Sequence, residues 1–169
     1  GEQTFTEIFS AIEQAKQYVL VQFFIIHNDQ IGRDLVEKLL AVQREGVQVS
    51  LLYDEIGSHA LPMSFFYDLI EAGARVYAFH TTRGFTNRFQ LNFRNHRKVV
   101  IVDGKVAFVG GHNVGDEYLG RNPKFGHWRD THLKLEGPSV LCVQLPFVED
   151  WYWATEETLT GLCWETETV

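Results

Sequence analysis

Amphipathic helix patterns alternate with short apolar runs through the first half of the sequence, and this alternation strongly limits the possible fold. The first helix pattern opens on a candidate capping box at residues 4–7 and continues to about Tyr18. Residues 19–26 are apolar apart from one glutamine, which is typical of a buried strand. The cycle then repeats with a helix over residues 32–45 and a strand over residues 47–53. Such alternation indicates βαβ units.

A third cycle and a less regular second half complete the pattern. The remaining predicted elements are a helix over residues 62–73, a strand over 75–79, a polar loop over 80–91, a strand over 131–136 and a helix over 140–157. The predicted fold is α/β, with a mixed, largely parallel sheet flanked by helices on both faces. Residues 1–169 are expected to form one domain.

The size and composition of the chain suit such a domain. With 169 residues and 45% hydrophobic content, it can bury a sizeable core. No apolar run approaches the ~20 residues that a membrane-spanning helix needs, so we expect the chain itself to be soluble. It begins with Gly1 inside a helix-start pattern, so we expect a piece of a longer protein. Cys142 and Cys163 have no metal-ligand spacing and are expected to be reduced and packed.

The stretch over residues 96–113 concentrates the side chains that can do chemistry. His96 and Lys98 lie two apart beside an apolar run. On a strand they would project from the same face and aim a base and a cation at one spot. Residues 99–102 are β-branched, as a buried strand requires. The Asp-Gly pair at residues 103–104 predicts a two-residue hairpin before a second strand.

Two glycines and an amide follow the hairpin. Gly110 and Gly111 let backbone approach a ligand without a Cβ in the way, which makes them candidate substrate-binding residues. Asn113 carries an amide that can donate to an oxyanion. The complete pattern is H-x-K-x4-D-x6-G-G-x-N.

Positive charge gathers around this motif although the chain is acidic. The net charge is −7, from 15 basic and 22 acidic residues, which argues against general nucleic-acid binding. Residues 81–129 contain nine of the basic residues and only three of the acidic ones. We expect a phosphate group to bind here, with Arg94 among its candidate ligands.

The motif resembles the signature of the phospholipase D superfamily and matches it at every defining position. The resemblance implies that a motif histidine, here His96, either attacks the phosphorus of a phosphodiester to form a phosphohistidine or acts as the acid and base for that step. A second motif supplies the other histidine. Lys98 and Asn113 would hold the phosphoryl charge, so no metal or other cofactor is expected. Asp103, in the hairpin turn, is expected to be structural.

The same resemblance implies a carboxylate that orients the motif histidine, supplied by a strand beyond the motif. Asp130, before the strand predicted over residues 131–136, is the candidate, and Asp116 and Glu117 are alternatives. The other histidines have no metal-ligand spacing and are expected to be mostly loop or surface residues. His112 lies beside the motif and is given no role.

The sequence contains one H-x-K motif, whereas the mechanism needs two histidines. Either two identical chains pair their motifs across a two-fold axis, or this chain is one half of a two-motif polypeptide. The flanking segments resemble the first half of bacterial cardiolipin synthases, which favours the second arrangement. These segments are residues 47–58, 95–98, 110–119 and 128–138.

This second resemblance implies a phosphatidyl transferase half-site. The longer protein would make cardiolipin from two phosphatidylglycerol molecules at the bacterial cytoplasmic membrane. Two other functions stay open: a homodimeric phosphodiesterase or nuclease, and a half that binds lipid phosphate without catalysis. The acidic net charge weighs against nucleic acid as a partner.

Overall fold

The computed structural model describes residues 1–79 and 95–165. Its elements are α1 (Glu2–Glu13), β1 (Tyr18–Phe23), α2 (Gln30–Arg44), β2 (Gln48–Asp54), the 3₁₀ turn η1 (Met63–Phe66), α3 (Tyr67–Glu71), β3 (Arg75–Phe79), β4 (Val99–Val102), β5 (Val106–Gly110), the 3₁₀ turn η3 (Asp116–Leu119), β6 (His132–Glu136) and α4 (Ser139–Thr155). The loop predicted over residues 80–91 lies outside the described residues.

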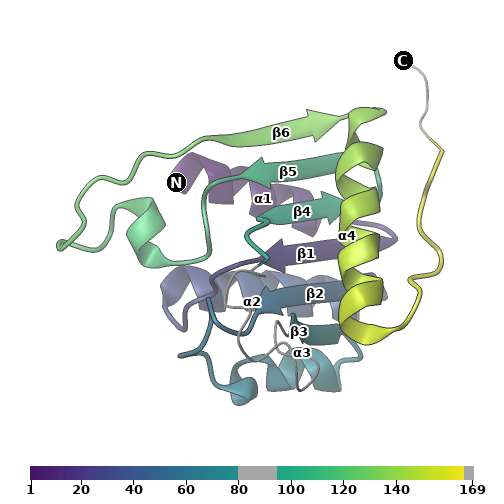
Figure 1. Cartoon of the computed structure of the whole chain (residues 1–169), viewed down its shortest axis with the longest axis horizontal. Coiled ribbons are helices and arrows are strands. Elements are labelled where there is room, and N and C mark those ends of the chain that lie inside the picture. The colour runs from purple at the N-terminus through teal and green to yellow at the C-terminus, as the bar shows by residue number, and fades with distance from the viewer. Residues whose placement is uncertain (80–94, 166–169) are drawn as a thin grey trace, which may run out of the picture.

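The six described strands form one sheet in the order β3-β2-β1-β4-β5-β6 (Figure 1). The α/β class and the mixed sheet are confirmed, but the prediction of a largely parallel sheet is wrong. Only the β1–β2 and β2–β3 pairs are parallel, whereas β1–β4, β4–β5 and β5–β6 are antiparallel. The βαβ pattern stops after β3. The strands from β4 to β6 follow one another without a crossover helix, which antiparallel neighbours do not need.

Helices cover both faces of the sheet, as predicted: α1, α2 and α3 lie on one face and α4 crosses the other (Figure 1). Side chains alternate between these layers along β1. Val19 and Val21 join the core under α1 and α2, whereas Leu20 joins the core under α4 with Trp151. Because β1 is buried on both faces, its sequence is apolar at nearly every position and does not alternate, and its polar residue Gln22 is buried too.

The β4–β5 hairpin has a longer connection than predicted. Val102 pairs with Val106, so three residues connect the strands instead of two. A tight turn closes where the Lys105 N–H donates to the Val102 carbonyl at 3.0 Å. Asp103 (φ 53°) and Gly104 (φ 66°) both adopt the left-handed conformation, which an Asp-Gly pair tolerates best. Lys105 is the extra residue.

The connection after β5 forms an isolated bridge with the chain that follows β1. The Val114 N–H donates to the Ile25 carbonyl at 3.1 Å, and the His27 N–H donates to the Val114 carbonyl at 2.9 Å. This bridge fixes the end of the motif beside the chain that leaves β1. Among residues 1–79 and 95–165, no helix is long and apolar enough to span a membrane.

Candidate active site

His96 and Lys98 lie just before β4 and share one aromatic neighbour. The His96 imidazole is exposed and stacks on the Phe24 ring, with ring centroids 4.0 Å apart and planes 25° apart. The Lys98 ammonium lies 5.3 Å from the centroid of the same ring. The two side chains therefore meet at one place, although they precede the strand and do not lie within it.

Lys98 is largely buried, with 9% of its surface exposed. Its Nζ donates to the His96 carbonyl at 2.6 Å, which holds the ammonium against the backbone of the motif. Burial lowers the pKa of Lys98, and the negative charge of Asp130 opposes this shift. An anion beside this ammonium would stabilise its charged form further.

A hydrogen-bonded cluster holds the segment that leads into the motif. The Asn95 N–H donates to Asp54 Oδ2 at 3.2 Å, and Asn95 Nδ2 donates to Asp150 Oδ2 at 2.6 Å. Asp150 also pairs with Arg97 Nη1 and accepts from Gln22 Nε2 at 2.8 Å. Because Asp150 belongs to α4 and Asp54 ends β2, two distant elements hold Asn95 and Arg97, the residues on either side of the motif histidine.

We expect the Asp150→Asn substitution to lower the free energy of unfolding by about 1–2 kcal/mol, because a neutral amide cannot accept from three donors as a carboxylate does. Urea unfolding measures the change. Glu149→Gln is the matched control, since Glu149 is the neighbouring residue and lines the same cleft. It should change stability by no more than about 0.5 kcal/mol. Equal losses in both variants would contradict the prediction.

A cleft of about 940 Å³ opens beside the motif. His96, Arg97 and Lys98 line one part of it, and apolar side chains of α4, including Val143, Pro146 and Trp153, line another. The cleft thus joins a basic surface to an apolar one. Exposed Cys142 also lines it, so the prediction that this thiol is packed in the protein is wrong.

Asn113 is buried beside the chain that carries Phe24. Its Oδ1 accepts from the Ile25 N–H at 3.1 Å, and its Nδ2 donates to the Tyr118 hydroxyl at 2.9 Å. An amide nitrogen carries two hydrogens, so one N–H remains for a ligand. Burial raises the pKa of Tyr118, which stays protonated at neutral pH.

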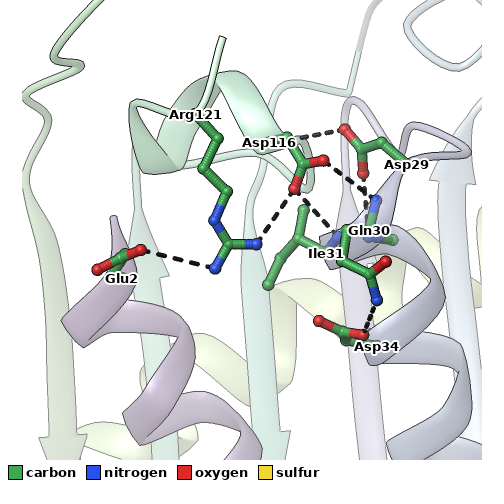
Figure 2. Close-up of polar contacts among 8 residues, drawn as sticks. Glu2, Asp29, Gln30, Ile31, Asp34, Asp116 and Arg121 are labelled. Atoms are coloured by element: carbon green, nitrogen blue, oxygen red, sulfur yellow. Dashed lines mark hydrogen bonds and ion pairs between the residues drawn. The ribbon is translucent and has the colours of Figure 1, made fainter.

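The residues after Asn113 are tied to the start of α2 (Figure 2). The Asp116 carboxylate accepts from the Gln30 and Ile31 N–H groups at 3.2 and 3.3 Å. In return, the Asp116 N–H donates to Asp29 Oδ2 at 2.7 Å, and Asp29 caps the same helix. Both carboxylate oxygens of Asp116 therefore bond to the start of α2, and within the described residues no hydrogen bond joins Asp116 to His96.

Gly110 and Gly111 are crowded by the chain that enters β6. A Cβ on Gly110 would lie 2.4 Å from the Thr131 carbonyl oxygen, and one on Gly111 would lie 2.0 Å from Asp130 Oδ1. Backbone packing therefore requires glycine at residue 110, whereas a side chain at residue 111 would first have to displace the Asp130 carboxylate. The backbone of Gly110 also lines the cleft, and its binding role stays a prediction.

Asp130 reaches this crowded region but does not bond to His96. Its Oδ1 accepts from the Thr131 N–H at 2.7 Å, and no hydrogen bond joins it to His96 within the described residues. Its charge nevertheless acts on Lys98. An orienting role for Asp130 stays a prediction. Arg94, the other predicted phosphate ligand, lies outside the described residues.

Two stacked histidines, which the sequence does not single out, lie beside Asp130. His112 is 2% exposed and stacks on half-buried His132, with ring centroids 5.6 Å apart. No ring nitrogen of either residue has a hydrogen-bond partner in the described structure. His112 lies in the connection after β5, as expected of a loop residue, but it is buried and not at the surface, because β6 pairs with β5 and brings His132 over it. His132 is the first residue of β6 and so does not lie in a loop.

Protonation of this pair should destabilise the fold. Burial lowers the pKa of His132 to about 4, helped by His112 and the chain's amino terminus and opposed by Asp130. The pKa of His112 is lowered too. An unfolded histidine titrates near ~6.5, so the unfolded chain binds more protons below that pH and stability falls as the pH drops toward 4.

We expect His132→Phe to remove part of this acid sensitivity. The difference in free energy of unfolding between wild type and variant should change by roughly 1–2 kcal/mol between pH 7 and 4.5. This figure is reduced because the ring is partly exposed. Urea unfolding at each pH measures it. Exposed His127 provides the control, and His127→Phe should track the wild type. Parallel pH curves for wild type and His132→Phe would contradict the prediction.

Residues 8–124 match the family model described as "Cardiolipin synthase, PLD-like domain". The chain is 59% identical over 157 residues to cardiolipin synthase A of Pseudomonas putida (strain W619) and equally so to that of Pseudomonas entomophila (strain L48). Each match covers 93% of this chain and 33% of the relative. The chain therefore spans about a third of the length of these relatives.

Solved structures share the fold at low identity. NucT from Helicobacter pylori has a TM-score of 0.68 at 16% identity, covering 90% of each chain. Phosphatidylserine synthase from Haemophilus influenzae Rd KW20 has a TM-score of 0.68 at 15% identity, covering 88% of this chain and 35% of the other. The family match extends over more than half of this chain and includes the motif, and so the chain belongs to the cardiolipin synthase family of phospholipase D-like domains.

Proposed function

We propose that this chain is one half of a two-motif phosphatidyl transferase that makes cardiolipin from two phosphatidylglycerol molecules. The observation that carries the proposal is the exposed His96 imidazole at the cleft, beside the buried ammonium of Lys98. Membership of the cardiolipin synthase family supports the choice of a phosphatidyl group as the part transferred. The longer protein would meet its substrate at the bacterial cytoplasmic membrane.

The reaction needs a nucleophile and an acid. One motif histidine attacks the phosphorus of phosphatidylglycerol, the bond from phosphorus to the glycerol headgroup oxygen breaks, and the histidine of the second motif protonates that oxygen. The second histidine then takes the proton from a hydroxyl of another phosphatidylglycerol. This hydroxyl oxygen attacks phosphorus, the phosphorus–nitrogen bond breaks, and cardiolipin forms.

The remaining side chains would stabilise charge in both steps. Lys98 and its counterpart in the second motif lie close to the phosphoryl oxygens in this proposal. A contact of about 4 Å gains roughly 4 kcal/mol at an effective dielectric of ~20. Asn113 would donate its free amide hydrogen. Within the described residues, no group of three or more histidine, cysteine or acidic side chains could hold a metal ion.

The direct test is a vesicle assay with labelled phosphatidylglycerol. The full-length protein should release glycerol and form cardiolipin, whereas this chain alone should do neither if it must borrow the second histidine. Hydrolysis of a diester by this chain alone, together with a dimer in sedimentation, would favour the homodimeric phosphodiesterase instead. Binding of phosphate by a full-length protein that makes no product would favour the non-catalytic half.

A further inference from the structure

The ring of Phe24 is the common contact of the two central motif side chains. Its face stacks on the His96 imidazole, and the Lys98 ammonium approaches the same ring. Phe24 directly follows β1, a strand that pairs with β4. The part of the chain that carries the aromatic ring is thus built into the centre of the sheet next to the motif.

The Phe24 ring and backbone are themselves held by the loop after β2. Ser58 Oγ donates to the Phe24 carbonyl at 3.3 Å and accepts from the Ile26 N–H at 3.0 Å. A Cβ on Gly57 would lie 2.1 Å from the Phe24 carbonyl oxygen and 2.9 Å from its ring carbon Cε2. Glycine at residue 57 therefore allows this loop to lie flat against both parts of Phe24.

One buried carboxylate links this loop to the motif. Asp54, which is 1% exposed, accepts from the Ile56 and Gly57 N–H groups through Oδ1, at 2.9 and 2.8 Å. Its Oδ2 accepts from the Asn95 N–H at 3.2 Å. The same side chain thus fixes the loop behind Phe24 and the residue that precedes His96.

We propose that Phe24 is a positioning residue for the transfer reaction. Stacking restricts the imidazole plane of His96 so that its edge remains free in the cleft. The electron-rich ring face also favours the charged form of Lys98, against the burial that lowers its pKa. The reaction role rests on the proposed function, but the alignment of the imidazole can be tested without activity.

Nuclear magnetic resonance of this chain tests the alignment. A ring stacked face to face shifts the carbon-bound imidazole protons of its neighbour upfield. We therefore expect the His96 signals, assigned by their loss in His96→Gln, to lie upfield of those of exposed His59 and His127. The displacement should disappear in Phe24→Leu and persist in Phe24→Tyr. It should also persist in Phe9→Leu, which removes another paired ring, on α1.

The absence of an upfield displacement in the wild-type chain would overturn the proposal even if a variant fails to fold. Its persistence in Phe24→Leu would do the same. In the full-length protein, Phe24→Leu should lower kcat about five- to tenfold with little change in KM, and Phe24→Tyr should restore it. An unchanged kcat would remove the reaction role. A wild-type protein that transfers nothing would refute the proposed function alone, because the spectroscopic result stands separately.

Discussion

Replacing His96 with glutamine in the full-length protein should reduce cardiolipin formation by roughly 10⁴-fold or more. The expectation follows whether His96 is the nucleophile or the acid and base, because no other histidine lines the cleft within the part of the chain that the structure describes. The exposed ring at the cleft gives glutamine room, so stability should change by less than about 1 kcal/mol. Initial rates with labelled phosphatidylglycerol measure the effect.

The control is a second histidine variant. It shows whether the loss of activity is specific to His96 or follows from replacing any exposed histidine. His59 is also exposed, and its ring nitrogen contacts the Ile56 carbonyl in a loop. His59→Gln should therefore retain near-wild-type transfer. Retention of more than about one hundredth of the rate in His96→Gln would contradict a central role, since so small a loss is less than general acid–base catalysis alone supplies.

The core could be predicted from sequence because its causes are local. Residues 19–26 form a mostly apolar run, and the strand that overlaps it, Tyr18–Phe23, is buried throughout. The end of that strand could not be predicted. Ile25 and Ile26 leave the β1–β4 ladder and meet Val114 instead, a partner almost ninety residues away in the sequence. No local sequence pattern predicts a pairing between residues so far apart.

The candidate site, like the core, has one part that the sequence predicts and another part that it does not. The H-x-K spacing predicts that His96 and Lys98 act at one place, and both do contact one ring. It does not predict the ring itself, because Phe24 lies more than seventy residues earlier in the sequence, directly after β1. Nor does it predict Asp150, since an acidic residue on an amphipathic helix is usually solvated. The supporting contacts become visible only when α4 and β1 are brought to the motif by the fold.

The two glycines show a requirement that the sequence indicates without showing its cause. At Gly110 the backbone of the chain entering β6 approaches closely, and at Gly111 the Asp130 carboxylate does so. The sequence predicts the approach of a ligand at these positions, and that binding role stays a prediction. A sequence can indicate that space is needed beside a residue, but the occupant depends on tertiary pairing, here between β5 and β6.

The largest loss of stability is expected from Asp103→Ala, at about 3–5 kcal/mol in urea unfolding. The Asp103 carboxylate accepts from three consecutive backbone N–H groups, those of Lys16, Gln17 and Tyr18, at 2.8, 2.8 and 2.9 Å. Asp103 is 7% exposed, so alanine would leave the buried Tyr18 N–H and two partly buried N–H groups without this partner. These bonds join the motif hairpin to the start of β1. Exposed Glu37→Ala is the control and should change stability by no more than about 0.5 kcal/mol.

Two further variants separate the carboxylate from the backbone conformation of the turn. Asp103→Asn keeps an oxygen for the two donors that share Oδ1 but turns an amide toward Lys16, so it should cost about 1–2 kcal/mol. Asp103→Gly relieves the positive φ but supplies no acceptor. If the hydrogen bonds dominate, glycine should be nearly as destabilising as alanine. A glycine variant close to wild type would instead place the cost in the left-handed turn and contradict the role assigned to the carboxylate.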